Sequence, residues 1–509
     1  MRNLDNEFVE NLTHHNVIDA FTKLKDGKTD MIPTDGEDAI KLYPGSDDIT
    51  HEKFQENIDY YASIICEKGK TGKYQFAPFK EHKIPKPPYA NLDEALKAGM
   101  DSNKEDKYIR VLSMSTIQDT VFQKLLADVL DGFAEDKFSE NINVYSYGYR
   151  KHKSSKMAVK KIRRFIDNGY YHVLDGDIRG FFDEINHVLL SERMNTFFGE
   201  ENIIVHKFLY RFINVRRIPP DMMKLYRQDS AIAEKRKQGI PQGGVLSGLL
   251  ANVFLYNFDL YVVNVLMPKY GFKYFRYADD FVLLFKDEEC IQEVYRLIKY
   301  RLQQNDKLFL HKIGSKTKLL DLSPVGNKCL DFLGFEISPN RLRIKKDNVR
   351  KFKNRIIQTL KEIEIDTLEG RLTWDEAYFR SVVKSINLRI VGLEDMIEQD
   401  NGLCLNPDCR KLIAKRSWIG YFMMVTDVEQ LREIDKAIRA AIYRDYKRRT
   451  EKNLRKTIML QHTAKGIESL KSVVKTYYKY RKQVEKYGNE TCKCERYFDK
   501  ETGKIRLKL

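Results

Sequence analysis

The stretch that decides the fold of this 509-residue chain runs from residue 275 to residue 285 and reads FRYADDFVLLF. Its two acidic residues, Asp279 and Asp280, lie between runs of aromatic and aliphatic residues. Such runs favour β-strands and Asp favours turns, so the pattern predicts a strand, a tight turn and a second strand. A surface turn is the ordinary explanation for an Asp-Asp pair, but these flanks are unusually apolar for one.

The turn also suggests a chemical role for the two acids. Successive side chains of a regular strand point to opposite faces, whereas a turn can direct both carboxylates towards one point. Adjacent carboxylates repel each other unless a cation lies between them, and Mg²⁺ is a common cation with a preference for oxygen ligands. A divalent metal site is therefore the alternative to a surface turn.

A third acid, Asp177, follows the short apolar segment at residues 171–174. Alone it would be read as a helix cap. Together with the two acids of the turn, it could complete a pocket for two divalent ions about 3.5–4 Å apart, which activate an attacking hydroxyl and stabilise a leaving pyrophosphate.

The segment from residue 239 to residue 247, GIPQGGVLS, is the next candidate for ligand binding. Its glycines would allow the backbone to approach a ligand closely, and the amide of Gln242 could reach a base or a sugar. An ordinary loop-to-helix junction, with Ser247 near the first helical turn, is the alternative.

Composition favours a polyanionic partner. The net charge is +16 and the isoelectric point is about 9.2, which is typical of proteins that bind nucleic acid. Residues 444–509 contain 20 Lys and Arg against 8 Asp and Glu. The chain has no obvious apolar membrane span or signal core, and its seven cysteines suit a reducing compartment. We therefore expect a cytoplasmic protein; the C-x4-C and C-x-C pairs near the end lack the spacing of common zinc modules.

The hydrophobic pattern predicts an α+β centre followed by mostly helical material. Strands are expected at residues 108–114 and 171–174, and helices at 116–130, 156–166, 186–213, 245–266 and 291–304. Residues 1–80 should be helical with a loop at 33–48. Residues 79–88 should form a turn-rich connector, and the stretch up to residue 106 should add a surface element.

The chain resembles reverse transcriptases of the bacterial branch typified by group II intron maturases, over about residues 105–450. The motifs that carry this resemblance occur in the family's order: RVLS at 110–113 with TIQD at 116–119, SYGYR at 146–150, GDIRGFFD at 176–183, PQGGVLS at 241–247, YADD at 277–280, KTK at 316–318 with FLGF at 332–335, and WIGYF at 418–422. One departure is that Gly248 follows the motif serine, where the family usually has Pro.

This resemblance implies roles for individual residues. Asp177, Asp279 and Asp280 would bind two Mg²⁺ ions, for which Mn²⁺ could substitute, and Lys316 would be the general acid for pyrophosphate, with Lys318 as a rival. Phe182 would act as a steric gate against a 2′-hydroxyl. Other roles would fall to nucleotide contacts at Lys107, Arg110, Gln242 and Gly243, and to nucleic-acid contacts at Arg150, Lys475, Lys479, Arg481 and Lys482.

The implied fold is an α+β right-hand polymerase with fingers, a palm with an antiparallel sheet, and a helical thumb. We expect an N-terminal extension at 1–105, fingers at 106–170, palm at 171–340, a maturase-like thumb at 341–450 and a basic, tyrosine-rich tail at 451–509. Cations interleaved with aromatics in the tail suit structured or single-stranded RNA, although a helix packed on the thumb is the alternative.

The expected function is an RNA-directed DNA polymerase that takes deoxynucleoside triphosphates and an RNA template and makes DNA. The near-absence of His in the last 60 residues argues against a His- and Cys-rich endonuclease, and this favours an antiviral defence enzyme working with a structured noncoding RNA. A group II intron maturase without the endonuclease is the alternative, and a palm-fold nucleotide cyclase is the weakest hypothesis. The primer and a homo-oligomeric state stay open.

Overall fold

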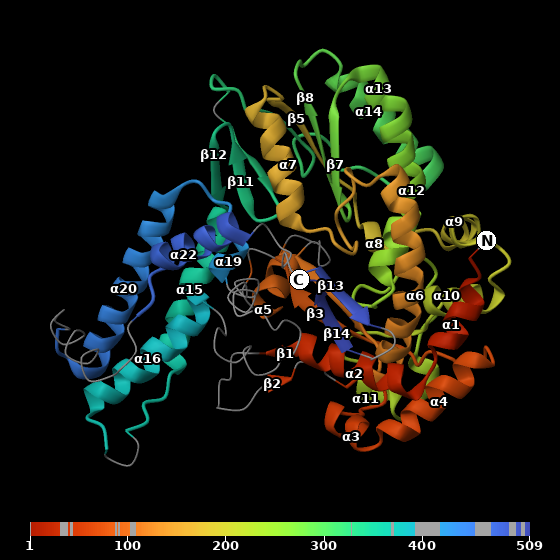
Figure 1. Cartoon of the computed structure of the whole chain (residues 1–509), viewed down its shortest axis with the longest axis horizontal. Helices are drawn as coiled ribbons and strands as arrows, with labels where there is room; N and C mark the ends of the chain where they lie inside the picture. The colour runs from red at the N-terminus through yellow and green to blue at the C-terminus, as the bar shows by residue number, and fades with distance from the viewer. Residues whose placement is uncertain are drawn as a thin grey trace. The chain divides into compact units, whose positions relative to one another are not determined.

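The computed structural model describes residues 2–30, 39–40, 44–86, 89, 92–101, 108–326, 328–367, 371–391, 418–453, 470–487, 495–499 and 504–508. The chain divides into two compact units, Met1–Gly326 and Asn327–Leu509 (Figure 1). The five segments expected from the sequence are finer than this division and stay a prediction.

A four-stranded antiparallel sheet organises the first unit. Its strands lie in the order β7 (Lys273–Tyr277), β8 (Asp280–Phe285), β5 (His172–Asp177) and β9 (Lys318–Asp321). Every residue of β8 after Asp280 is buried, because both faces of this central strand are covered. The sheet agrees with the antiparallel palm sheet expected from the sequence.

Helices cover this sheet. The basic helix α7 (Ser155–Asp167) lies against β7 and β8 (Figure 1) and buries Ala158, Val159, Ile162 and Ile166. Apolar residues at this spacing form one face of a helix, and Lys160, Lys161 and Arg164 between them are exposed. The predicted amphipathic helix is thus confirmed, with one added residue at each end.

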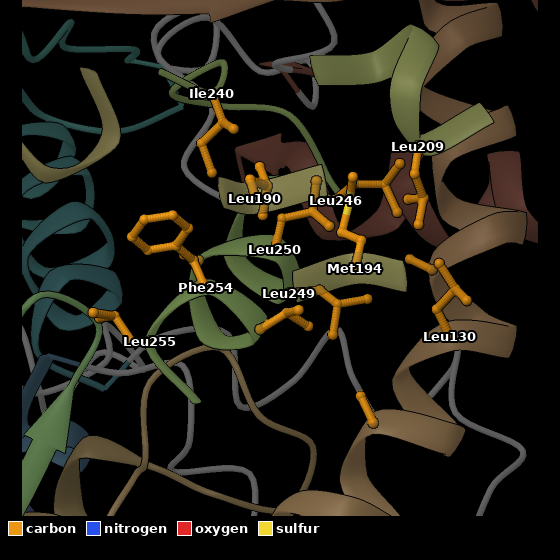
Figure 2. Packing of buried hydrophobic residues seen from close by; sticks show 14 of the residues in the cluster. Leu130, Leu190, Met194, Leu209, Ile240, Leu246, Leu249, Leu250, Phe254 and Leu255 are labelled. Atoms are coloured by element: carbon orange, nitrogen blue, oxygen red, sulfur yellow. The ribbon is translucent and has the colours of Figure 1, made fainter. Parts of the chain in front are cut away.

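The centre of the core is α12 (Ser247–Tyr261), which continues through a π-helical turn (Val262–Leu266) into α13 (Met267–Tyr270). Figure 2 shows Leu249, Leu250 and Phe254 of α12 packed among residues of neighbouring helices and of the preceding loop: Leu130, Leu190, Met194, Leu209 and Ile240. A helix that is apolar on nearly all sides must be buried on nearly all sides. By length and composition alone, Ser247–Tyr270 is the one helix in the described part of the chain that could cross a membrane; 61% of its apolar window is buried in the protein, as in a core helix.

A second sheet supports one side of the first unit. It contains β4 (Ile109–Met114), β3 (Phe79–Pro85) and β6 (Arg217–Ile218), in that order. The turn-rich connector predicted at 79–88 was therefore wrong over Phe79–Pro85, where seven residues form a strand antiparallel to β4. The expected surface element before residue 106 is helix α5 (Leu92–Asp101).

The N-terminal helices share the main core. Phe8 of α1 (Leu4–Asn11) lies edge-on against Phe122 of α6 (Ile117–Asn141) and Phe208 of α10 (Ile203–Ile213), with ring centroids 5.7 Å apart in both pairs. The long helix predicted at 186–213 is two helices, α9 (His187–Phe198) and α10. They part at Gly199, whose φ of +87° suits the end of a helix.

The remaining elements of the first unit are α2 (His14–Lys28), β1 (Thr29–Asp30), β2 (Ala39–Ile40), α3 (His51–Glu56), α4 (Ile58–Lys70), α8 (Phe181–Glu184), α11 (Met223–Tyr226), a 3₁₀ turn (Ser230–Ile232), α14 (Ile291–Arg301) and a π turn (Leu302–Asp306).

The second unit begins with a three-stranded antiparallel sheet and is otherwise mainly helical. Its elements are β10 (Leu330–Phe332), β11 (Phe335–Ser338), β12 (Arg341–Ile344), α15 (Lys346–Glu362), α16 (Trp374–Val391), α19 (Trp418–Tyr421), α20 (Val428–Thr450), α22 (Val473–Tyr487), β13 (Glu495–Asp499) and β14 (Lys504–Lys508). The helical content agrees with the predicted thumb, whereas the hairpin β13–β14 was not expected. The Cys404, Cys409, Cys492 and Cys494 pairs lie outside the described residues.

Candidate active site

The sheet register brings the three predicted carboxylates together. Asp280 is the first residue of β8 and stands opposite Asp177, the last residue of β5. On its other side Asp280 stands opposite Tyr277 of β7, so Ala278 and Asp279 form the turn between the two strands. Two neighbouring strands and one turn thus place three acids at the same edge of the sheet.

The turn is conformationally strained and is held from behind. Ala278 has a φ of +59°, a region that residues with a Cβ rarely occupy. Its carbonyl accepts a 2.8 Å hydrogen bond from Nη1 of Arg276, and the same nitrogen donates to Oδ1 of Asn252 at 3.0 Å. These bonds offset the strain and fix the position of the turn.

Arg276 is itself fixed by a buried ion pair with Asp259 of α12. Its Nε donates to Oδ1 of Asp259 at 2.8 Å and its Nη2 to Oδ2 at 2.5 Å, and both side chains are fully buried. The hydroxyl of Tyr274 donates to the same carboxylate at 2.6 Å. A paired and fully hydrogen-bonded charge is tolerated in a core, so the apolar helix α12 can anchor the hairpin.

The electrostatics of the turn reflect crowded carboxylates. Burial raises the pKa of Asp279, the Asp177 carboxylate adds to the rise, and Arg110 and Lys316 oppose it. Removal from water raises the pKa of Asp280 to about 7, and repulsion from Asp279 and Asp177 adds to the shift. An excess of negative charge is therefore concentrated at this edge of the sheet.

Two basic side chains face Asp177. Nζ of Lys316 lies 3.7 Å from its Oδ2, and Nε2 of His311 lies 3.4 Å from its Oδ1. Lys316 is 64% exposed, so its charge remains available to a ligand. Its rival Lys318 lies on β9, opposite Asp175 rather than opposite one of the three acids.

The predicted glycine loop passes beside this site. The backbone carbonyl of Gln242 accepts a 2.8 Å hydrogen bond from the amide of Ser113 on β4, and a Cβ on Gly243 (φ +122°) would lie 2.7 Å from the Ser113 carbonyl. The side-chain amide of Gln242 donates to both oxygens of Asp183, at 3.1 and 3.0 Å. The loop is thus held to β4 and to the segment after Asp177.

Two aromatic residues border the site. Phe182 is half-buried in the short helix α8, and its ring lies edge-on to the ring of Tyr149 at a centroid distance of 6.2 Å. Partial burial raises the pKa of Tyr149, and the nearby charge of Asp279 adds to the rise. Arg110 is exposed on β4, and Lys107 lies outside the described residues.

Comparison with known proteins shows which family model the chain matches. Residues 102–337 match the family model described as reverse transcriptase (RNA-dependent DNA polymerase). The chain contains a reverse transcriptase domain. This domain contains all three carboxylates and the glycine loop. It also contains the strands that position them: β4, β5, β7, β8 and β9.

Two curated relatives are similar over parts of their length. The group II intron-encoded protein LtrA of Lactococcus lactis is 29% identical over 166 residues, which are 33% of this chain and 25% of LtrA. Protein YkfC of Escherichia coli is 25% identical over 336 residues, covering 59% of this chain and 77% of YkfC. The chain thus matches about a quarter of the length of LtrA.

Among solved structures, telomerase from Candida albicans in complex with a fragment of telomeric RNA is 14% identical, with a TM-score of 0.41. The match covers 82% of this chain and 71% of that chain.

The acids of the reverse transcriptase domain are suited to divalent cations. Oxygen ligands from carboxylates are what Mg²⁺ prefers, and two ions would neutralise the repulsion that adds to the effect of burial on the pKa of Asp280. Within the described residues, no three His, Cys, Asp or Glu side chains are already gathered into a metal cage.

Arg150 requires a correction. The sequence suggested a nucleic-acid contact, but the Arg150 side chain is 0% exposed and its Nη2 lies 2.6 Å from Oε1 of Glu135. Nη1 donates to the carbonyl of Ser146 at 2.9 Å. The guanidinium of Arg150 therefore bonds to groups within the protein, and it holds the 146–150 segment to α6.

The basic residues predicted in the tail lie on α22 of the second unit. Lys475, Lys479, Arg481 and Lys482 are all exposed. The other side of α22 is packed: Tyr477 is fully buried and donates to the carbonyl of Val425 at 2.6 Å. The helix is therefore amphipathic, with a packed apolar face and an outward basic face.

Sequence reasoning missed several residues that shape the site. Asp183 binds Gln242, His311 faces Asp177, and Asn252, Asp259 and Arg276 form the support behind the turn. Asp259 gave a usable signal, because a charged residue in an otherwise apolar helix needs a buried partner.

Proposed function

We propose that this chain is an RNA-directed DNA polymerase that extends a 3′-hydroxyl with deoxynucleoside triphosphates. The observation that carries the proposal is the register of the palm sheet, which sets Asp177 opposite Asp280 and places Asp279 in the adjoining turn. Lys316 at 3.7 Å from Asp177 adds a cation beside the acids. This combination is suited to transfer of a nucleotidyl group.

Within this proposal each residue has one task. Asp177, Asp279 and Asp280 would hold two Mg²⁺ ions, for which Mn²⁺ could substitute. Such ions would supply activation of the attacking hydroxyl and stabilisation of the leaving pyrophosphate. Lys316, exposed beside Asp177, donates a proton to pyrophosphate.

The remaining residues select and orient the nucleotide. Arg110 and Lys107 attract the triphosphate, as cations placed near developing negative charge should. Gln242 and Gly243 contact the base or sugar through the loop that is fastened to Ser113. Phe182 excludes a 2′-hydroxyl by its bulk.

Replacing Asp279 and Asp280 together by Asn tests the proposal. This change keeps side-chain volume and removes charge, so the fold should remain intact. On an RNA template with a DNA primer, incorporation of deoxynucleotides should fall by at least about a thousandfold, as expected when electrostatic stabilisation of a transition state is lost. Asp287→Asn, an exposed acid just beyond β8, is the matched control. Undiminished synthesis by the double variant would refute the proposal.

We further propose that the polymerase is a prokaryotic antiviral defence enzyme that works with a structured noncoding RNA. The exposed basic face of α22 supports an RNA partner. A group II intron maturase is the second candidate, favoured by the similarity to LtrA. Sequencing the RNA and DNA that co-purify with the protein separates them: an excised intron favours the maturase, and a separate short RNA with its DNA copy favours the defence enzyme.

The tail supplies an independent test of RNA binding. Changing Lys475, Lys479, Arg481 and Lys482 to Gln should weaken RNA affinity and flatten its salt dependence, by about 0.7 in the logarithmic slope for each lost phosphate contact. The matched control changes four exposed lysines of the first unit, Lys53, Lys68, Lys70 and Lys73, by the same total charge. Equal effects of both sets would show that net charge, rather than α22, governs binding.

A further inference from the structure

Tyr149 has a backbone conformation that its side chain does not favour. Its φ is +54°, in the left-handed region. A bulky residue in this region is a genuine outlier and costs about 1–3 kcal/mol, so the surroundings must enforce it. The ring gains little burial in return, because the residue remains 52% exposed. Packing alone therefore does not account for the strain.

The support of the Asp279–Asp280 turn also enforces the conformation of Tyr149. The Asn252 amide that lies beside Arg276 donates to the carbonyl of Gly148 at 2.8 Å and to that of Tyr149 at 3.4 Å. Gly148 is pressed against the turn, since a Cβ there would lie 2.4 Å from the amide nitrogen of Ala278. The position of Tyr149 is thus fixed relative to the carboxylates.

The Tyr149 ring occupies space that a glycine leaves free. A Cβ on Gly248, the second residue of α12, would lie 2.6 Å from Cγ and 2.7 Å from Cδ1 of Tyr149. Any other residue at position 248 would carry a Cβ and would therefore displace the ring. Gly248 and Tyr149 therefore form a matched pair.

The position of the Tyr149 ring matters because this ring is paired with the ring of Phe182. The two rings meet at an interplanar angle of 89° and a centroid distance of 6.2 Å, an edge-to-face pair. Such pairs favour one relative orientation. Phe182 is also held by Phe181, whose ring lies 5.3 Å away. Two aromatic neighbours thus fix the Phe182 ring, and one of them is set by Gly248.

We propose that Tyr149, seated on Gly248, is a positioning residue that holds Phe182 against the sugar of the incoming nucleotide and thereby sets the discrimination between deoxyribonucleotides and ribonucleotides. This inference rests on the proposed polymerase function and deepens it. A gate excludes a hydroxyl only if it cannot move aside, so the neighbour that immobilises the gate contributes to selectivity.

The test measures kcat/KM for each deoxynucleotide and its ribonucleotide on one RNA template, with four variants. Tyr149→Ala removes the ring, and Gly248→Ala displaces it without removing it. Both should lower the deoxy-to-ribo ratio by about three- to tenfold, the effect of losing one edge-to-face aromatic pair. Tyr149→Phe keeps the ring and should retain the wild-type ratio. Phe182→Ala should give a larger loss than either.

Controls separate this role from a general loss of structure. Tyr300→Ala removes a 65% exposed tyrosine from α14 and should leave the ratio unchanged. Thermal unfolding of each variant checks folding. If Tyr149→Ala is unstable, the nucleotide ratio is measured with Gly248→Ala instead.

The outcomes are distinct. An unchanged ratio in Tyr149→Ala and Gly248→Ala, while Phe182→Ala lowers it, would overturn the inference and leave the polymerase function standing. Equal loss for both nucleotide types would also overturn the inference. No templated incorporation by the wild-type protein would overturn the proposed function and, with it, the inference.

Discussion

The turn that carries Asp279 and Asp280 has two very different sides. Behind it, Arg276 and Asp259 form an ion pair that is fully buried, with hydrogen bonds to Tyr274, Asn252 and the turn itself. In front of it, Lys316 is 64% exposed at 3.7 Å from Asp177, and Arg110 is exposed on β4.

The two sides therefore have different tasks: the residues behind the turn fix its position, and the residues in front of it are available for the reaction. The charges behind the turn neutralise each other before any substrate arrives, so their work is to fix backbone position. The charges in front leave an uncompensated excess of carboxylates, which metal ions would neutralise and which a triphosphate could then approach. Mutations behind the turn should therefore change stability first, and mutations in front should change rate with little effect on stability.

The sharpest test removes the buried acid. Asp259→Ala leaves Arg276 and Tyr274 without their partner in a dry core, so the free energy of unfolding should fall by about 3–5 kcal/mol. Denaturant unfolding followed by circular dichroism measures the change. Asp48→Ala is the matched control, because its Arg227 pair has the same 2.5 Å distance but is exposed, and it should cost less than about 1 kcal/mol. Similar losses in both variants would remove the distinction.

A front-side lysine should show the opposite behaviour. Lys316→Ala should lower kcat by about 100-fold or more, since a general acid typically contributes at least that factor, and it should leave the unfolding midpoint unchanged. Lys318→Ala is the comparison, with an expected change of less than about threefold because Lys318 is not beside the three acids. If Lys318 proves the more sensitive residue, the general acid has been misassigned.

Close packing between β5 and β8 predicts a second effect on stability. A Cβ on Gly176 would lie 2.3 Å from the buried ring of Phe281, so Gly176→Ala should destabilise the protein by about 1–3 kcal/mol. Gly132→Ala in α6, where the nearest atom would lie 3.5 Å away, should be neutral or stabilising. Thermal unfolding of the two variants measures the difference, and a tolerated alanine at 176 would mean that the sheet adjusts.

The smallest expected effect concerns the exposed arginine. Arg110→Gln should raise KM for deoxynucleoside triphosphates by about fivefold, because an exposed charge contact contributes at most about 1 kcal/mol. Its kcat and unfolding midpoint should stay near the wild-type values. A loss of stability would show that Arg110 supports the fold rather than binding the nucleotide.

Some features were predictable because they are local. The strand–turn–strand pattern around Asp279 follows from β-prone flanks and two turn-forming acids, and the amphipathic α7 follows from its apolar spacing. The strand at Phe79–Pro85 was missed because its lysines and the prolines at 85, 87 and 88 resemble a connector, and the strand is stabilised by pairing with the distant strands β4 and β6. The single helix expected at 186–213 ends at Gly199 because the chain turns there in the left-handed region.

Other features depend on contacts between distant segments. Arg150 is a basic residue in a motif, and nothing in its neighbours in sequence shows that Glu135 buries it. The close fit of Tyr149 on Gly248 joins residues 99 positions apart.

The sequence by itself predicted which residues carry the chemistry, because the motifs around Asp177, Gln242 and Asp279 resemble those of reverse transcriptases. It also determined the strands that carry the acids, since their hydrophobic pattern is local. Only the tertiary structure decided that Asp177 stands opposite Asp280, that Asp259 anchors the turn through Arg276, and that Arg150 is structural. Strand register and burial depend on contacts between segments far apart in the chain, and these contacts leave no periodic signal in the sequence.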